Sequence, residues 1–236
     1  MTAIETTIKE IIPRARNVKS FRVARGDGFE FAAGQFMRVT VPVAEGEQTR
    51  SLSFSSSPAH SDYFEFTKKI TDSGFSKKLD SLKAGDPVKI KGPMGRFTQR
   101  DGENRVAFLS GGIGITPIRG ICEDIIAAGR GVDMVLLYGN RAVDDIAFKE
   151  DFDAWEKKRE MRVVHFLEKA PGDGSWSGRA GYITGAIIKE EVPDYMDRLF
   201  YICGPTPMVE ILKKILTEKL QLSDERVVTE NFVGYK

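Results

Sequence analysis

The sequence predicts two domains, an N-terminal antiparallel β-barrel followed by a C-terminal α/β domain with a parallel sheet. Three observations lead to this prediction. Short β-rich segments separated by turn residues fill the chain up to a polar stretch at 99–104. After that stretch, apolar strands alternate with segments of helical spacing. Two of those strands end in glycine followed by threonine and proline. We place the domain boundary between residues 98 and 99, which gives domains of 1–98 and 99–236.

The barrel strands are expected where Val, Ile, Phe and Thr cluster between glycine or proline residues. These segments are 6–12, 18–24, 36–43, 51–55, 63–69 and 87–91. A short helix is expected over 74–82. The many short strands in succession are typical of a small antiparallel barrel.

The strands of the second domain are expected at 106–109, 134–138, 162–166, 199–203 and 226–229. The helix after the first strand carries an apolar stripe at Ile118, Ile121, Cys122, Ile125 and Ile126. The last helix repeats it at Met208, Ile211, Leu212, Ile215 and Leu216, and a third is marked by Phe148, Phe152 and Trp155. Such stripes face a core, and the alternation predicts a parallel sheet with right-handed crossovers.

Composition excludes several classes of protein. The net charge of +1 argues against a nucleic-acid binder. No apolar run is long enough for a membrane helix, and the N-terminus lacks the form of a signal peptide. Cys122 and Cys203 lie far apart in apolar segments, which favours a reduced, cytoplasmic protein and leaves no ligand set for an iron–sulfur cluster. His60 and His165 are isolated, so no metal site is expected.

The first glycine-rich junction follows the strand at 106–109. Gly111, Gly112 and Gly114 allow a sharp turn or a close approach to a ligand. Thr116 is expected to cap the following helix, with Pro117 in its first turn. Free N–H groups at such a helix start attract anions, above all a nucleotide pyrophosphate.

A second junction of the same kind follows the strand at 199–203. Gly204 ends the strand, Thr206 is expected as the cap and Pro207 as the first helical residue. Both junctions leave the carboxyl ends of buried strands, which is the edge that holds the ligand in open α/β sheets.

The barrel half contains three further motifs. These are Arg50 to Pro58, a polar strand entering a turn, Gly74-Phe-Ser76 at a helix start, and the tight turn at 92–97. Pleating puts Arg50, Leu52 and Phe54 on one face and the serines on the other. Each motif alone is typical of a structural turn.

Together and in this order, the motifs resemble the ferredoxin–NADP reductase family. Its Arg-x-Tyr-Ser is matched by Arg50, Leu52 and Ser53, and its Gly-Pro-x-Gly-x-Phe at 92–97. Its Gly-Gly-x-Gly-x-Thr-Pro is matched at 111–117, and its Cys-Gly-Pro-x-x-Met by Cys203, Gly204, Pro205 and Met208. The segment 138–141 resembles the end of its second dinucleotide strand, and 230–235 the tail of its bacterial oxygenase-reductase branch. The resemblance covers nearly the whole chain.

The resemblance implies a flavin-binding barrel, a nucleotide-binding α/β domain, and FAD and NAD(P)H as cofactors. In the barrel, Arg50 would hold the flavin pyrophosphate, and the backbone of Gly74, Phe75 and Ser76 would cradle the other phosphate. Ser53 would lie near flavin N5, with Leu52 over the isoalloxazine.

In the second domain the resemblance assigns the nicotinamide nucleotide. Gly111, Gly112, Gly114 and Thr116 would bind its pyrophosphate, with Asn140 and Arg141 at the ribose end. Cys203 would lie against the nicotinamide ring, beside Gly204, Pro205 and Met208. Glu230 and Phe232 would close over the site, and Glu230 would stabilise charge or relay a proton. By residue type alone, Cys203 reads as a buried small hydrophobe, and 230–232 as a partly frayed terminus.

Leucine at position 52 departs from the family pattern. It cannot supply aromatic stacking, which is worth roughly 0.5–1.5 kcal/mol beyond area burial. Flavin is therefore held less tightly, or Phe54 takes the place of the missing aromatic ring.

Three functions follow. The first is hydride transfer from NAD(P)H to FAD, with electrons passed on to a separate ferredoxin, rubredoxin or oxygenase component. The lysines at 68, 69, 77, 78, 83, 89 and 91 form a dock for an acidic carrier or simply a solvated face. The second is an NAD(P)H:flavin reductase that releases reduced flavin. The third is an electron-transfer subunit of a larger complex.

The choice between NADH and NADPH stays open, since Arg141 suits a 2′-phosphate but also a surface position beside Asp144 and Asp145.

Overall fold

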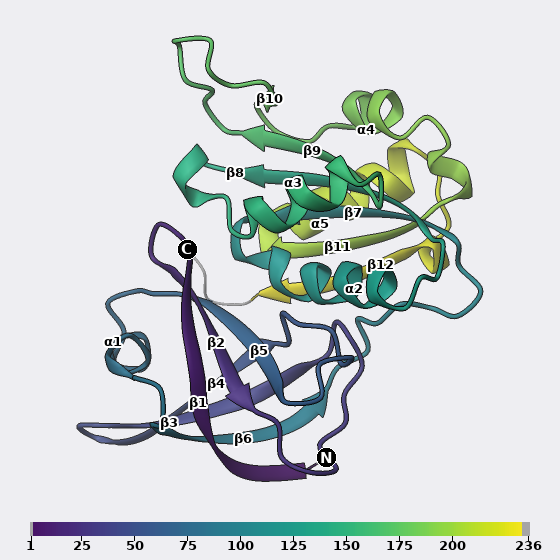
Figure 1. Cartoon of the computed structure of the whole chain (residues 1–236). Helices are drawn as coiled ribbons and strands as arrows, with labels where there is room; N and C mark the ends of the chain where they lie inside the picture. The colour runs from purple at the N-terminus through teal and green to yellow at the C-terminus, as the bar shows by residue number, and fades with distance from the viewer. Residues whose placement is uncertain (1, 233–236) are drawn as a thin grey trace.

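The N-terminal half of the computed structural model is an antiparallel barrel, as predicted (Figure 1). The structure describes residues 2–232. The strands are β1 (Thr2–Ala15), β2 (Val18–Ala24), β3 (Phe36–Val43), β4 (Gly46–Ser53), β5 (Tyr63–Lys69) and β6 (Pro87–Met94). They are arranged in the order β4-β3-β6-β1-β2-β5. A bridge between Phe54 and Phe66 joins the two edge strands.

Aromatic rings fill the barrel. Phe31 stacks on Phe54 with ring centroids 4.0 Å apart, and Phe29 stacks on Phe64 at 5.0 Å. The predicted short helix is α1 (Gly74–Ser81), and the Ser73 side chain accepts a hydrogen bond from the N–H of Ser76 at its start. Since α1 contacts β3 and β4, it covers one end of the barrel.

The C-terminal half has a six-stranded parallel sheet, in the order β10-β9-β8-β7-β11-β12. Its strands are β7 (Arg105–Gly111), β8 (Asp133–Asn140), β9 (Arg162–Leu167), β10 (Arg179–Ala180), β11 (Leu199–Pro205) and β12 (Val227–Phe232). The five predicted strands are confirmed. The two-residue strand β10 was not predicted, because it pairs only through two positions and carries no apolar pattern.

Helices cover both faces of this sheet. The helices α2 (Ile115–Ala127) and α3 (Lys149–Lys157) pack on one face, against alternate residues such as Phe108 and Tyr138. The helices α4 (Gly185–Glu191) and α5 (Thr206–Lys214) pack on the other, against residues such as Leu109 and Leu137. The three predicted stripes mark α2, α3 and α5, whereas α4 was not predicted. Phe148 precedes α3, and Ile215 and Leu216 lie in a π-helical turn after α5. Ile211 does not face the core as predicted, because it is 58% exposed and lines the cavity described below.

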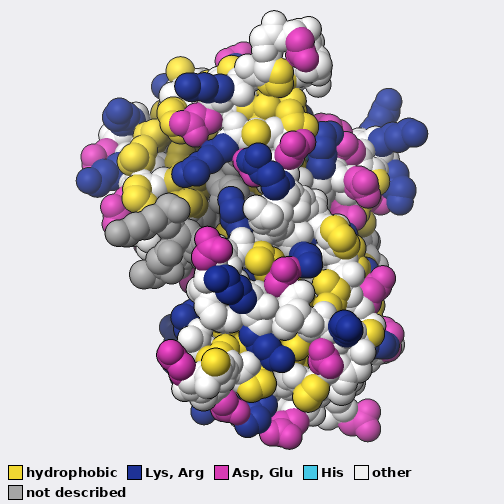
Figure 2. All heavy atoms as spheres, turned by 90° about the vertical axis from the view of Figure 1, so that its left-hand side faces the viewer, with side chains coloured by type: hydrophobic (Ala, Val, Ile, Leu, Met, Phe, Trp, Pro, Cys, Tyr) yellow, Lys and Arg dark blue, Asp and Glu magenta, His cyan; other side chains and the backbone are white. Residues whose placement is uncertain are grey.

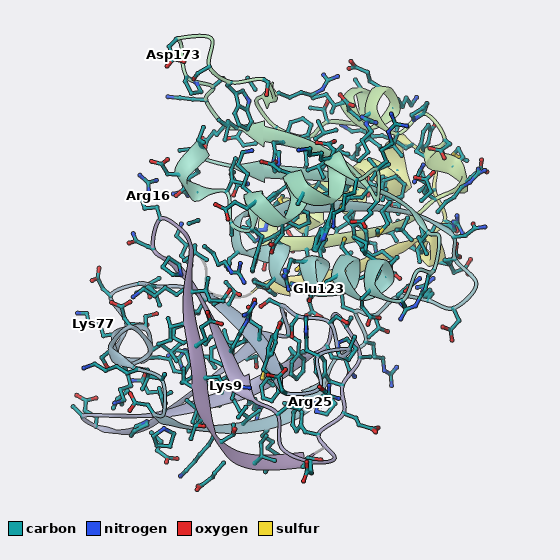
Figure 3. All side chains as sticks on the ribbon, in the orientation of Figure 1. Lys9, Arg16, Arg25, Lys77, Glu123 and Asp173 are labelled. Atoms are coloured by element: carbon teal, nitrogen blue, oxygen red, sulfur yellow. The ribbon has the colours of Figure 1, made fainter. Side chains whose placement is uncertain are left out.

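The two halves meet through α2 and the β1–β2 hairpin. Residues 95–104 connect β6 to β7, and the predicted boundary at 98/99, which stays a prediction, lies within this connection. The tip of the hairpin reaches the second half, where the Arg16 N–H donates to the Asp144 carbonyl at 2.8 Å and its guanidinium pairs with Asp145 at 2.9 Å. Figure 3 labels Arg16 at this tip and Glu123 on α2, at the junction of the two halves.

Candidate dinucleotide and flavin site

The two glycine-rich junctions pack directly on one another. A Cβ atom at Gly114 would lie 2.3 Å from the Cys203 carbonyl oxygen, and one at Gly111 would lie 2.4 Å from the Met208 sulfur. A Cβ at Gly204 would lie 2.5 Å from the methyl carbon of Met208. At Gly114 the obstacle is the Cys203 backbone, so this position needs glycine to bring the two loops together. At Gly111 and Gly204 the obstacle is the flexible end of the Met208 side chain, which could shift to admit a Cβ. Loop packing is thus a second reason for the motif, besides approach to a phosphate.

Both predicted threonine caps are wrong. The loop after β7 first forms a single 3₁₀ turn at Gly112–Gly114, so α2 begins at Ile115 and Thr116 lies inside its first turn. There the Thr116 hydroxyl donates to the Ile113 carbonyl at 3.1 Å and caps nothing. In the second junction Pro205 occupies the cap position, and Thr206 is the first helical residue.

A cavity of about 540 Å³ opens at the carboxyl edge of the parallel sheet. Barrel residues form one side of it, namely Val18, Lys69 and Thr71. The second half supplies the other side, including Gly111, Gly112, Gly114, Asn140, Arg141, Pro205, Met208 and Phe232. Eight of the predicted site residues are therefore brought together around one space that spans both halves of the molecule.

Asn140 is a buried polar side chain that fits a ligand in the cavity. It is only 8% exposed, and neither its amide oxygen nor its amide nitrogen makes a hydrogen bond of good geometry within the described residues. The Tyr138 phenol is its polar neighbour; burial raises the pKa of that phenol, and Asn140 is close enough to lower it in part. Tyr138 is held in place by a hydrogen bond from the phenol to the Gly112 carbonyl at 3.1 Å. Buried polar atoms are normally satisfied, so these two atoms fit a polar ligand in the cavity.

The outer end of the cavity carries charges of both signs. Glu168 follows the end of β9 and accepts a hydrogen bond from the Tyr182 hydroxyl at 2.9 Å. Arg141 follows the end of β8 and is exposed, and the pKa of Tyr182 reflects both charges, since Glu168 raises it more than Arg141 lowers it. Arg141, the residue considered for binding a 2′-phosphate, therefore has the acidic Glu168 nearby.

Cys203 and Glu230 lie side by side on paired strands. They are register partners of β11 and β12. Cys203 is fully buried, and burial, with a smaller contribution from Glu230, raises the pKa of its thiol. A neutral thiol is a poor nucleophile, so this site suits a packing contact and not attack. Burial also raises the pKa of Glu230, which is half-buried. Phe232 lines the cavity, and residues 233–235 of the predicted tail lie outside the described residues.

The barrel presents a basic cluster near the start of α1. The Arg50 guanidinium lies 5.6 Å from the Phe75 ring centroid. Lys68 is 6% exposed, and burial first, then Arg50 and Lys69, lowers its pKa to about 8. A depressed lysine pKa beside two other cations indicates a place that stabilises negative charge. Gly74, Phe75 and Ser76 form the first turn of α1, so three predicted residues lie beside this cluster.

The segment that would face the flavin ring is buried. Leu52 and Ser53 are 6% and 5% exposed, and Phe54 is fully buried. Because Phe54 stacks between other rings inside the barrel, the idea that it replaces the missing aromatic residue is wrong. Arg50 and Leu52 do share a face of β4, opposite Val39 and Met37 on β3.

The comparisons with known proteins agree with this geometry. Two family models match, the oxidoreductase FAD-binding domain over residues 5–99 and the oxidoreductase NAD-binding domain over residues 108–214. Ferredoxin–NADP reductase B of Sorangium cellulosum is 27% identical and aligns with 95% of this chain and 94% of its own length. The plasma membrane-associated coenzyme Q6 reductase PGA3 of Saccharomyces cerevisiae is 31% identical, over 88% of this chain and 68% of that protein. The chain belongs to the ferredoxin–NADP reductase family.

Other relatives of this chain are longer. The glycine betaine monooxygenase reductase subunit of Pseudomonas aeruginosa is 31% identical over 80% of the chain but only 52% of that protein. The chain thus spans about half the length of several curated relatives that it matches. Its fold is that of the flavohem-like FAD/NAD-binding domain of nitric oxide dioxygenase from Vibrio cholerae, with a TM-score of 0.87 at 20% identity over 97% of this chain and 98% of that one.

The lysines considered as a dock do not form one uniform face of the protein. Lys68 is buried, Lys69 lines the cavity, and Lys89 pairs with Glu47 at 2.6 Å. The remaining lysines, at 77, 78, 83 and 91, are exposed or partly exposed. In Figure 2, Lys and Arg side chains lie on both sides of the waist between the two halves, interspersed with acidic ones.

Several residues that line the cavity were missed by sequence reasoning. Val18, Lys69 and Thr71 come from the barrel, and no local motif connects them with the second domain. Glu168 follows a predicted strand, so the strand-end rule used for the glycine loops was available for it as well. Among residues 2–232, no helix has the length and apolarity for a bilayer crossing, and no three potential metal ligands converge.

Proposed function

We propose that this cytoplasmic reductase transfers a hydride from NAD(P)H to FAD and passes the electrons on to a separate one-electron carrier such as a ferredoxin. The observation that carries the proposal is the cavity with one wall from each domain. The basic cluster at α1 lies on the barrel side, and the glycine loops and the buried Asn140 lie on the other. Each half thus offers a fitting anchor for one of the two dinucleotides.

The residues of the chain would bind and orient, because the flavin itself accepts two electrons and releases them singly. Arg50, Lys68 and the first turn of α1 would hold the FAD phosphates, and the backbone at Gly111 and Gly112 would hold those of the nicotinamide nucleotide. Cys203, a neutral buried thiol that does not line the cavity, would pack beneath the nicotinamide site. Glu230, whose pKa is raised by burial, would lie beside it to stabilise charge or relay a proton.

Two observations support a one-electron carrier as the electron acceptor, namely the names of relatives and the exposed lysines of the barrel. A ferredoxin, a rubredoxin or an oxygenase component would supply the one-electron centre, since residues 2–232 offer no group of metal ligands. One relative is named as a ferredoxin reductase and another as the reductase subunit of a monooxygenase. The exposed lysines at 77, 78, 83 and 91 would suit an acidic carrier.

The test is purification followed by anaerobic addition of NADH and NADPH. The protein is expected to keep FAD, to lose its flavin absorbance with one of the two nucleotides, and then to reduce an added ferredoxin. Flavin absorbance that neither nucleotide bleaches would contradict the proposal and point to an electron-transfer subunit that acts only within a larger complex.

A flavin reductase is the second candidate, and Leu52 favours it. The position carries no aromatic ring, and only 6% of the side chain is exposed, so the isoalloxazine would find little to stack on. In that case the purified protein is colourless, and its activity saturates with added flavin without any protein carrier. Retained FAD after gel filtration argues against this candidate.

A further inference from the structure

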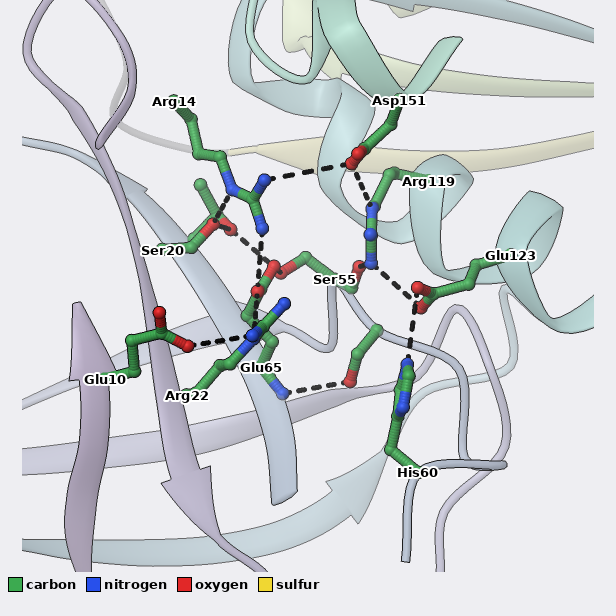
Figure 4. Close-up of polar contacts among 12 residues, drawn as sticks. Glu10, Arg14, Ser20, Arg22, Ser55, His60, Glu65, Arg119, Glu123 and Asp151 are labelled. Carbon is green, nitrogen blue, oxygen red and sulfur yellow. Dashed lines mark hydrogen bonds and ion pairs between the residues drawn. The ribbon is translucent and has the colours of Figure 1, made fainter. Parts of the chain in front are cut away.

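A buried arginine on α2 ties the two domains together. The Arg119 Nη1 donates to the Ser55 carbonyl at 2.7 Å and to Glu123 Oε2 at 2.8 Å. Its Nε donates to Asp151 Oδ2 on α3 at 3.1 Å. Arg119 is 6% exposed, and Figure 4 shows it between the barrel segment of Ser55 and the two helices.

Ser55 is itself fixed firmly to the barrel. Its hydroxyl donates to Glu65 Oε1 at 2.9 Å, and its N–H donates to the Glu65 carbonyl at 2.7 Å. Glu65 is 1% exposed and is also bound by Arg14 at 2.9 Å. A continuous set of charge-assisted hydrogen bonds therefore runs from the barrel through Ser55 into α2 (Figure 4).

The next residue on α2 brings the backbones into contact. A Cβ at Gly120 would lie 3.0 Å from the Phe54 carbonyl oxygen and 3.3 Å from that of Ser56. Glycine at this position lets the helix approach the barrel segment more closely than any other amino acid would allow. Gly120 and Arg119 thus define the same joint by two independent features, a close approach and a buried polar clamp.

We propose that Arg119, together with Gly120, positions the nicotinamide loop relative to the flavin strand and so sets the geometry of hydride transfer. Arg119 lies one helical turn after Thr116, on the helix that begins at the glycine loop. The Ser55 carbonyl that it binds lies two residues after Ser53. The joint therefore links the two segments that carry the proposed cofactor contacts through a short and rigid path.

The reaction would be sensitive to this joint because hydride transfer needs its two atoms in close contact. A misplacement of about 1 Å can cost about 10²-fold in rate. The inference rests on the hydride transfer proposed above. It adds that Arg119 is a positioning residue that touches neither cofactor.

The chain contains a matched control. Arg198 is 5% exposed, and its guanidinium binds Asp194 at 2.8 Å, Asp133 at 2.7 Å and the Val106 carbonyl at 3.2 Å. All these partners belong to the second domain, so a substitution there removes the hydrogen bonds of a buried guanidinium without touching the joint. The carboxylates of Arg198 are more exposed than those of Arg119, so the melting temperature of each variant is measured beside its rate.

The experiment is anaerobic stopped-flow reduction of the FAD-loaded enzyme, with NADH or NADPH, whichever bleaches the flavin. Arg119→Met, Arg119→Lys, Gly120→Ala and Arg198→Met are compared with the unmodified protein. The limiting rate of flavin reduction, the nucleotide Kd, the FAD content and the long-wavelength charge-transfer absorbance are measured for each. Arg119→Met is expected to lower the limiting rate by about tenfold or more and to weaken the charge-transfer band, with Kd and FAD content within about twofold.

Arg119→Lys keeps one donor and is expected to recover part of the rate. Gly120→Ala is expected to slow reduction although alanine favours the helix. Arg198→Met is expected to lower the melting temperature but to keep the limiting rate. Limiting rates within about twofold of the unmodified enzyme for both Arg119→Met and Gly120→Ala would overturn the inference.

If Arg119→Met does not fold, Arg119→Lys and Gly120→Ala decide by the same criterion. An unmodified protein that neither nucleotide bleaches would instead contradict the proposed function.

Discussion

FAD binding to the apoprotein is expected to take up a proton above pH 7, and Lys68 is the group that takes it up. The pKa of Lys68 is lowered from 10.5 to about 8, first by burial and then by Arg50 and Lys69. The pyrophosphate of FAD would bring negative charge to this cluster and raise that pKa again. The charged amine is disfavoured in the apoprotein and favoured in the complex, so affinity is highest below pH 8 and falls as the pH rises from there.

The size of the effect follows from the shift. If the bound lysine regains its ordinary pKa, uptake is about 0.1 proton at pH 7, about 0.5 at pH 8 and about 0.9 at pH 9. Between pH 8 and 10.5 the Kd for FAD rises by up to about tenfold per pH unit. A full return is worth about 3.4 kcal/mol, since each pKa unit corresponds to about 1.36 kcal/mol. This figure is an upper limit, because nearby Arg50 and Lys69 keep opposing the charge.

Isothermal titration calorimetry of FAD into apoprotein measures the uptake directly. Titrations at pH 9 in two buffers with different ionisation enthalpies give the number of protons bound. Lys68→Met is expected to abolish most of the uptake. Lys89→Met is the control, because Lys89 is exposed, pairs with Glu47 and is not among the charges that lower the pKa of Lys68. Equal uptake in Lys68→Met and in the unmodified protein would refute the assignment, as would no uptake at all.

Three further predictions concern the second domain. Arg141→Ala is expected to raise the Kd for NADPH by about tenfold with little effect on the Kd for NADH, and Glu168→Gln is expected to lower the Kd for NADPH relative to that for NADH. Each of these two charges acts on a 2′-phosphate, which only NADPH carries. Equal changes in both Kd values would contradict this assignment. Gly114→Ala places a Cβ 2.3 Å from the Cys203 carbonyl and is expected to cost about 1–3 kcal/mol, visible as a lower melting temperature. The pKa of Glu230 is raised by burial, so the stability that this residue contributes at low pH is lost as the pH rises through that pKa. Glu230→Gln is therefore expected to flatten the pH dependence of the free energy of unfolding. An unchanged pH profile would contradict this.

The fold was predictable because its signals are local. Strands β2, β3 and β5 begin and end at the predicted residues, since turn residues bound them on both sides. Strand β1 begins four residues earlier than predicted. Its first residues carry no clear apolar pattern and are held in the sheet by pairing with β6. The caps at Thr116 and Thr206 were misplaced because a 3₁₀ turn and a proline shift the helix starts, which residue preference does not reveal.

The site was only partly predictable because much of it depends on tertiary contacts. The glycine loops, Asn140 and Arg141 lie where strand ends and motifs indicate. Lys68 gave no sign of its burial, which arises from the strand it shares with the barrel core. The Arg119–Ser55 contact joins residues 64 positions apart, and nothing near either residue indicates the other.

The primary kinetic isotope effect on flavin bleaching tests the central claim most directly. The enzyme is reduced anaerobically with NADH, or with NADPH if that is the preferred nucleotide, carrying hydrogen or deuterium at the transferred position of C4. Direct hydride transfer between two rings in contact predicts slower bleaching with deuterium and a charge-transfer band that precedes it. Bleaching at the same rate with both isotopes and without such a band would contradict a cleft that brings the two rings together.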